Sequence, residues 1–265
     1  MLYVVIMMGA ILLHPFAFAV VFGVLLFFTQ YEFYAMVEDA GHKILRLPGT
    51  ILGILFFLIS FGVSNGFLPH TFEFSFIPIV FALFVIELFR PDKLTLQNSG
   101  LTLLGFMYIA VPFGLMNFVM HVSHNGTNAN YYPWVLAGVF FILWANDSFA
   151  YLVGSLLGKH KLCPKISPAK SWEGLIGGAV FALIMGLLNA VMFQALSMFS
   201  WIIIALITVA FGTLGDLFES KIKREIGAKD SGNILPGHGG FLDRLDSLLF
   251  AIPAVFLWLI FAGSL

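Results

Sequence analysis

The chain has 265 residues, of which 60% are hydrophobic and only 10% are Asp, Glu, Lys or Arg. A water-soluble domain carries roughly a quarter of its residues as charges, so this composition excludes a soluble protein and indicates an integral membrane protein. The thirteen basic and fourteen acidic residues nearly cancel, and the single cysteine, Cys163, excludes an internal disulfide.

Long apolar runs recur along the chain. Residues 1–31 carry no charge, and further runs lie at 51–68, 74–86, 101–120, 134–157, 174–197, 198–215 and 247–264. A run of roughly 20 apolar residues crosses a hydrocarbon core about 30 Å thick, so each run predicts a membrane helix. The first run is interrupted by His14 and Pro15. We therefore expect an all-α polytopic membrane protein with eight or nine transmembrane helices.

The basic residues fall in four blocks, and two predicted spans separate each block from the next. These blocks are Lys43 and Arg46; Arg90 and Lys93; Lys159, Lys161, Lys165 and Lys170; and Lys221, Lys223, Arg224, Lys229 and Arg244. Because positive loops face the cytoplasm, we expect these blocks on the cytoplasmic side of the cell inner membrane. The intervening turns and the C-terminus are then external.

Three acids near the last block have positions that suggest a cation site. Asp216 ends the apolar run that starts at 198, and Asp243 and Asp246 are three residues apart where a new apolar helix begins. That spacing puts Asp243 and Asp246 on one face of the first turn. Few carboxylates with room for water and phosphate oxygens suit Mg²⁺. The alternative is that Asp243 and Asp246 cap the helix and pair with Arg244 and Lys229.

Basic residues accompany these acids. Lys223 and Arg224, with Ser220 one turn earlier if the segment is helical, are suited to the negative charge of a polyphosphate. The alternative is a positive flank that contacts lipid headgroups, which fits Lys159 and Lys161 better.

Asp147 lies about 15 Å inside its span at 1.5 Å per residue. An ionisable group at that depth is by default functional, so we expect it to face a polar cavity open to the cytoplasm, which Glu32 and Glu87 are also candidates to line. The alternative is a buried carboxyl satisfied by a neighbouring helix. After this span, Lys165, Ser167, Lys170 and Ser171 precede a predicted helix start at 172, where backbone N–H groups can hold phosphate.

Two groups of residues together match one enzyme family. They are Ser220, Lys223, Arg224, Lys229, Asp230 and Gly232, followed by Leu235, Pro236, His238, Gly239, Gly240, Asp243, Arg244 and Asp246. With this pattern the sequence closely resembles the phosphatidate cytidylyltransferases, also called CDP-diacylglycerol synthases. The likeness extends upstream to Gly215 and Asp216, and less tightly to the 167–174 segment and to Asn146 and Asp147. Residues 1–130 match only as hydrophobic spans, so we expect N-terminal membrane helices there and a catalytic membrane domain in 131–265.

The resemblance implies an enzyme that condenses CTP with phosphatidic acid and releases pyrophosphate, giving CDP-diacylglycerol. It implies that Asp216, Asp243 and Asp246 hold Mg²⁺, that Ser220, Lys223 and Arg224 contact phosphates, and that Lys170 and the Ser167 loop bind the nucleotide. It also implies a homodimer. A second cation stays open. We add Asp147, Lys229, His238 and Arg244 as candidate substrate-binding residues.

Two other classes remain as alternatives. A transporter would be expected to place its charges at mid-membrane, whereas only Asp147 lies clearly deep. A different lipid phosphotransferase, such as a CDP-alcohol phosphatidyltransferase, would carry an Asp-Gly-x-x-Ala-Arg opening that this sequence lacks. We expect membrane lipid as a partner and no nucleic acid.

Overall fold

The computed structural model describes residues 2–90, 96–122, 130–228, 231–232 and 239–265. The chain forms two compact units. The first unit contains Met1–Phe118 and Glu225–Leu245, and the second contains Val119–Arg224 and Asp246–Leu265. The segment Glu225–Leu245 therefore folds with the N-terminal helices, although it is distant from them in sequence.

The first unit begins with a helix break at the predicted place. Helix α1 (Leu2–Leu13) ends before His14, and α2 (Pro15–Asp39) starts with Pro15 in its first turn. His14 has extended dihedrals, and its Nδ1 accepts a hydrogen bond from the Phe16 N–H at 3.2 Å. Proline suits this position because the first helical N–H has no partner within the helix.

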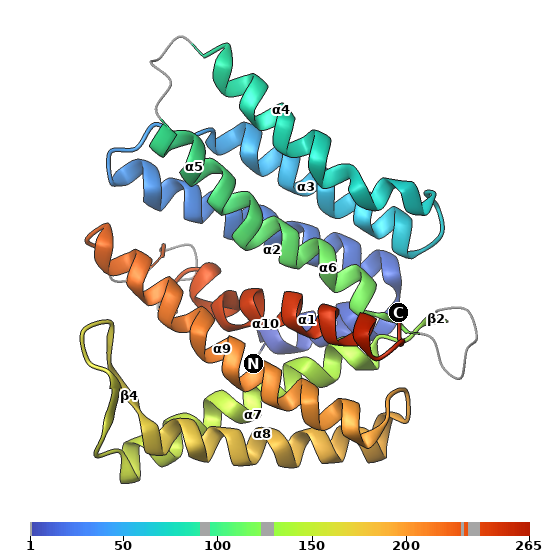
Figure 1. Cartoon of the computed structure of the whole chain (residues 1–265), viewed down its shortest axis with the longest axis vertical. Helices are drawn as coiled ribbons and strands as arrows, with labels where there is room; N and C mark the ends of the chain where they lie inside the picture. Colours follow the sequence, from blue (N-terminus) through green and yellow to red (C-terminus); the bar gives the residue numbers. More distant parts are fainter. Residues whose placement is uncertain (1, 91–95, 123–129, 229–230, 233–238) are drawn as a thin grey trace. The chain divides into compact units, whose positions relative to one another are not determined.

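The remaining helices of the first unit pack around α2 and α3 (Figure 1). They are α3 (Arg46–Ser64), the 3₁₀ turn η1 (His70–Ser75), α4 (Phe76–Leu88), α5 (Leu96–Gly105), the π-helical turn η2 (Phe106–Ala110) and α6 (Val111–Val119). Phe18, Phe22, Phe57 and Phe113 are fully buried. The hydroxyl of buried Tyr34 donates to the Thr102 carbonyl at 2.7 Å, which satisfies a polar group inside this apolar core.

The second unit contains the other long helices and two short antiparallel strand pairs. Its elements are β1 (His121–Val122), β2 (Asn130–Tyr131), α7 (Trp134–Leu157), β3 (Lys161–Cys163), β4 (Ser167–Ser171), α8 (Trp172–Phe193), α9 (Met198–Glu225) and α10 (Leu242–Phe261), whose first four residues belong to the first unit. Helices α7 and α8 lie side by side (Figure 1). A Cβ on Gly178 would lie 2.7 Å from the Asn146 Oδ1, so only glycine permits this approach.

Eight helices in the described part of the chain are long and apolar enough to cross a membrane. They are Pro15–Asp39, Arg46–Ser64, His70–Leu88, Leu96–Val119, Trp134–Leu157, Trp172–Phe193, Met198–Glu225 and Leu242–Phe261. The protein is thus a helical multi-pass membrane protein, as its composition predicts. Helix α9 continues to Glu225, beyond the apolar run that ends at 215, so Ser220 also lies on this helix. Charged residues at 216–225 end the hydropathy signal, but they do not oppose helix formation.

Candidate active site

Two of the predicted acids come together where α9 meets α10. A Cβ on Gly215 would lie 2.5 Å from the Asp246 carbonyl oxygen, and one on Gly212 would lie 3.6 Å from the Ser247 Cβ. Gly215 therefore allows the two helices to approach closely. Asp246 is buried, its Oδ1 accepts the Ser247 N–H at 2.6 Å, and its carboxylate interacts electrostatically with Asp216.

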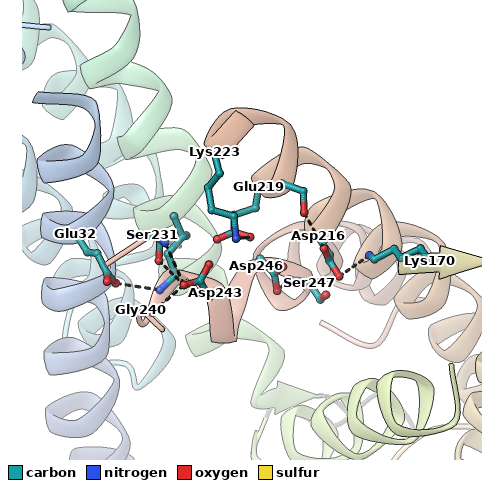
Figure 2. A network of polar contacts seen from close by, with 12 residues as sticks. Glu32, Lys170, Asp216, Glu219, Lys223, Ser231, Gly240, Asp243, Asp246 and Ser247 are labelled. Atoms are coloured by element: carbon teal, nitrogen blue, oxygen red, sulfur yellow. Dashed lines mark hydrogen bonds and ion pairs between the residues drawn. The ribbon is translucent and has the colours of Figure 1, made fainter. Parts of the chain in front are cut away.

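Asp216 also interacts with a basic side chain and with a hydroxyl group. The Lys170 ammonium forms an ion pair with Asp216 Oδ2 (Figure 2). The Ser220 hydroxyl donates to Asp216 Oδ1 at 3.3 Å. Ser220 lies one helical turn beyond Asp216 on α9, as expected if the segment is helical. Sequence-predicted residues from the 167–171 segment and from α9 thus meet at one carboxylate.

Asp147 belongs to the same group of charges. It is exposed although it lies in the middle of α7, and its Oδ1 accepts a hydrogen bond from the Asn146 amide at 3.1 Å. Its carboxylate interacts electrostatically with Asp216 and Lys170. We name Asp147, Asp216, Asp246 and Lys170 the acidic cluster; it carries three carboxylates and one ammonium.

Lys170 reaches the site from a β hairpin that the sequence did not predict, and Ser167 lies on the same strand. Strand β4 pairs with β3, with Lys161 opposite Ser171 and Cys163 opposite Ser167. Helix α8 begins at Trp172, as expected, and the Ser171 hydroxyl caps it by accepting the Gly174 N–H at 3.1 Å. The Ser171 oxygen is therefore already used as a helix cap.

Lys223 forms an ion pair that the sequence analysis missed. Its ammonium lies 2.8 Å from Glu219 Oε2, and the two side chains are only 13% and 2% exposed (Figure 2). Glu and Lys four residues apart on a helix are natural neighbours, so the spacing was available as a signal once α9 was known to extend this far. Arg224, the next residue, is exposed.

Asp243 lies in the first unit and holds the chain just before α10. Its Oδ2 accepts hydrogen bonds from the Gly240 N–H at 2.8 Å, the Ser231 N–H at 3.1 Å and the Ser231 hydroxyl at 3.0 Å (Figure 2). Asp243 and Asp246 both lie in the first turns of α10, as their spacing predicts. Arg244 between them is exposed. Lys229 and His238 lie outside the described residues.

The two other acids that were candidates for a shared cavity have different surroundings. Glu87 lies 3.5 Å from Arg90 in an ion pair, and its side chain is 4% exposed. Glu32 on α2 is 3% exposed, and its Oε2 accepts the N–H groups of Phe241 and Leu242, at 2.7 Å and 3.3 Å. Sequence spacing gives no sign of this contact, because more than 200 residues separate the partners.

The donor atoms of the site suit a hard cation. Asp216 and Asp246 repel each other, and Asp246 is buried, so the ion pair with Lys170 offsets only part of their charge. Carboxylate oxygens in such surroundings favour a bound divalent cation. Within the described residues, no group of three or more His, Cys, Asp and Glu side chains is arranged to hold a metal ion. Asp216 and Asp246 are the two predicted metal ligands that lie in the second unit, and their role as ligands stays a prediction.

A sequence profile of the cytidylyltransferase family matches residues 1–262. The chain belongs to this family. Among its relatives, the phosphatidate cytidylyltransferase of Staphylococcus saprophyticus is 34% identical over 221 residues, which cover 82% of this chain and 81% of that protein. The phosphatidate cytidylyltransferase of Haemophilus influenzae is 40% identical over 176 residues, or 64% of this chain and 61% of that protein. That of Staphylococcus aureus strain COL is 35% identical over 221 residues, with 82% and 81% covered.

Proposed function

We propose that this protein transfers the cytidylyl group of CTP to phosphatidic acid, giving CDP-diacylglycerol and pyrophosphate in phospholipid biosynthesis. The observation that carries the proposal is the match to the cytidylyltransferase family over residues 1–262, together with relatives named phosphatidate cytidylyltransferase that are 34% identical over four fifths of this chain. The acidic cluster and its neighbouring basic residues support the proposal, because they supply the charges that this reaction requires.

Charge is the main obstacle to the reaction. The attacking oxygen belongs to the phosphate monoester of phosphatidic acid, whose second pKa is about 6, so it is largely dianionic at neutral pH and needs no strong general base. It must approach a triphosphate that carries several negative charges. The protein therefore has to neutralise both anions and hold the attacking oxygen in line with the departing pyrophosphate.

The basic residues of α9 and β4 supply part of that neutralisation. Lys223 and Arg224, with the Ser220 hydroxyl, contact phosphate oxygens in this proposal, and Lys170 and the Ser167 segment bind the nucleotide. The ion pairs of Lys170 with Asp216 and of Lys223 with Glu219 keep these ammonium groups in place before substrate binds. The further substrate-binding residues that we propose are Asp147, Lys229, His238 and Arg244.

The metal that the family implies is Mg²⁺. Asp216, Asp243 and Asp246 would hold it, since all three are carboxylates and Asp243 lies one helical turn before Asp246 on α10. When bound, Mg²⁺ supplies positive charge that stabilises the phosphate oxygens during transfer. The aspartates orient their oxygens through the hydrogen bonds already described, and they need no proton transfer to do so.

The membrane helices fit a lipid substrate. The acyl chains of phosphatidic acid remain in the hydrocarbon while its headgroup meets CTP at the cytoplasmic surface, where the positive-inside rule places the basic blocks. We propose accordingly that the polar cavity faces the cytoplasm of the cell inner membrane and that the enzyme works as a homodimer.

Purified protein in detergent, given radiolabelled CTP and phosphatidic acid with or without Mg²⁺, tests the proposal. We expect labelled CDP-diacylglycerol only when both substrates and Mg²⁺ are present, and no product after chelation with EDTA. Incorporation of a labelled alcohol such as inositol into lipid, with CDP-diacylglycerol supplied as the donor and CMP released, would indicate another lipid phosphotransferase. Ion flux through reconstituted vesicles without any product would indicate a transporter.

A further inference from the structure

Glu32 joins the N-terminal helices to the start of α10. Its Oε2 accepts hydrogen bonds from the N–H groups of Phe241 and Leu242, at 2.7 Å and 3.3 Å. The first N–H groups of a helix have no partner within that helix, and a carboxylate near them is further favoured by the helix dipole. Glu32 therefore caps α10 from a distant helix, α2.

Phe28, which lies on the same face of α2 as Glu32, also contacts Phe241. The Phe28 ring stacks on the Phe241 ring, with centroids 5.4 Å apart and planes inclined by 16°. Phe28 and Glu32 are four residues apart and so lie one above the other on the helix. Together they hold Phe241 at two points, its ring and its backbone N–H.

The glycines beside Glu32 show that this contact shapes the local chain. A Cβ on Gly232 or on Gly240 would collide with the Glu32 carboxylate. Gly240 also donates its N–H to Asp243 at 2.8 Å, and Asp243 accepts two more hydrogen bonds from Ser231. Figure 2 shows Glu32, Gly240, Ser231 and Asp243 in this arrangement. Two carboxylates thus accept hydrogen bonds from three consecutive backbone N–H groups. Asp243 accepts the N–H of residue 240, and Glu32 accepts those of residues 241 and 242.

We propose that Glu32 is a positioning residue for the cytidylyl transfer, because it fixes the first turn of α10 and thereby the orientation of Asp243. This inference rests on the proposed function, in which Asp243 helps to hold the metal. Glu32 itself contacts the backbone at 241 and 242, and it acts on the reaction through Asp243. Sequence motifs place the site in the C-terminal half of the chain, so this role assigns part of the site to the N-terminal helices.

Hydrogen exchange measured by mass spectrometry tests the structural half without any turnover. Protein in detergent, without CTP or Mg²⁺, is compared as wild type, Glu32→Ala, Glu32→Gln and Glu38→Gln. Glu38 is the matched control, because it lies on α2 and pairs with Arg46 at 3.1 Å. We expect amides 241 and 242 to exchange at least about 10-fold faster in Glu32→Ala, with a smaller change in Glu32→Gln, which keeps an acceptor oxygen, and none in Glu38→Gln. Unchanged exchange in Glu32→Ala would overturn the inference.

A double-mutant cycle tests the catalytic half. We expect Glu32→Ala to lower kcat roughly 10-fold or more with KM for CTP nearly unchanged, and Glu32→Gln to recover much of kcat. In the Asp243→Asn background, Glu32→Ala should lower kcat only slightly further. The effects of the two substitutions are not additive when one residue acts through the other. Additive losses, or a Glu32→Gln variant as inactive as Glu32→Ala, would each refute positioning through Asp243.

The hydrogen-exchange test of the cap and the kinetic test of catalysis can be contradicted independently. If wild type makes no CDP-diacylglycerol, the proposed function fails, whereas the exchange result still decides whether Glu32 caps α10. Should Glu32→Ala not fold, Phe28→Leu replaces it, because this change removes the ring stacking and keeps the carboxylate. Faster exchange at Phe241 in Phe28→Leu supports the two-point contact, and unchanged exchange contradicts it.

Discussion

Asp246 is the most constrained acid of the acidic cluster. It is buried, it accepts the Ser247 N–H through Oδ1, and both Asp216 and Asp147 oppose its charge. Replacing the carboxylate by an amide removes that repulsion and keeps the shape of the side chain. An ionised carboxylate at this position therefore costs stability, as is common for functional groups.

We predict that Asp246→Asn lowers CTP-dependent turnover by roughly 10²-fold or more, while its thermal unfolding midpoint in detergent does not fall. The turnover loss follows from the missing metal ligand, and the retained midpoint follows from the relieved repulsion. Asp243→Asn should lower turnover by a similar factor, with a measurable residual rate, while leaving the protein folded. Wild-type rates in both variants would refute the assignment of Asp243 and Asp246 as metal ligands.

Lys223 has two roles to separate, since it pairs with Glu219 and is also proposed to contact phosphate. Lys223→Ala leaves Glu219, which is 2% exposed, without this partner, and breaking a buried ion pair destabilises a protein by about 3–5 kcal/mol. We predict that Lys223→Ala raises KM for CTP or phosphatidic acid and lowers the unfolding midpoint.

The double variant Lys223→Ala with Glu219→Gln separates these effects. It should recover much of the midpoint, because the buried charge is gone, and should not recover the KM. Lys159→Ala serves as the control for general positive charge, since Lys159 is exposed. Equal KM changes in Lys159→Ala and Lys223→Ala would indicate that both lysines only contact lipid headgroups.

At the scale of elements, the crossing of α9 and α10 depends on Gly215. A Cβ there would lie 2.5 Å from the Asp246 carbonyl oxygen, whereas a Cβ on Gly100 of α5 would meet nothing within 4 Å. We predict that Gly215→Ala destabilises by about 1–3 kcal/mol through overpacking and lowers turnover, because Asp216 moves away from Asp246. Gly100→Ala should change neither property, as measured by thermal unfolding and turnover. A Gly215→Ala variant like wild type would show that this close approach is not required.

Local signals predicted many of these elements, and distant contacts escaped prediction. The break at His14 and Pro15 and the helix starts at 172 and 242 follow from proline, a capping serine and the onset of an apolar run. The extension of α9 to Glu225 was left open, because a hydropathy reading stops at the first charges. The β3–β4 pair was missed because its strands are too short to show alternation.

The same distinction applies to the candidate site: residues marked by local signals were predicted, and contacts between distant residues were not. Asp216 and Asp246 were singled out from their positions at the ends of apolar runs, and the structure places them in electrostatic contact. The partnership of Glu32 with Phe241 joins residues 209 positions apart, and no periodic pattern encodes a contact of that range. Lys229 and His238 fall outside the described residues, so their roles stay predictions.

At the scale of the whole molecule, the four basic blocks predict the orientation in the membrane. Cys163 lies in β3 within the block that starts at Lys159, and it is the only cysteine of the chain. We predict that a membrane-impermeant maleimide labels Cys163 in inverted inner-membrane vesicles and not in intact spheroplasts, because the positive-inside rule predicts this block on the cytoplasmic side.

A relocated cysteine provides the control for this labelling. Ser197 is exposed in the turn between α8 and α9, which the same rule places outside. Ser197→Cys in a Cys163→Ser background should therefore be labelled in spheroplasts and protected in inverted vesicles. The reverse pattern for both cysteines would invert the topology and put the acidic cluster on the wrong side for CTP.

The length of the apolar part of α9 relates the depth of Asp216 to the thickness of the surrounding lipid layer. It has 28 residues, and the apolar part at 198–215 spans about 27 Å at 1.5 Å per residue, slightly less than an average hydrocarbon layer of about 30 Å. Longer acyl chains would draw Asp216 into hydrocarbon unless the surrounding layer thins, whereas shorter chains leave it in the headgroup region. The enzyme proposed to build membrane lipid would thereby sense, through the depth of one aspartate, the thickness of the membrane it helps to make.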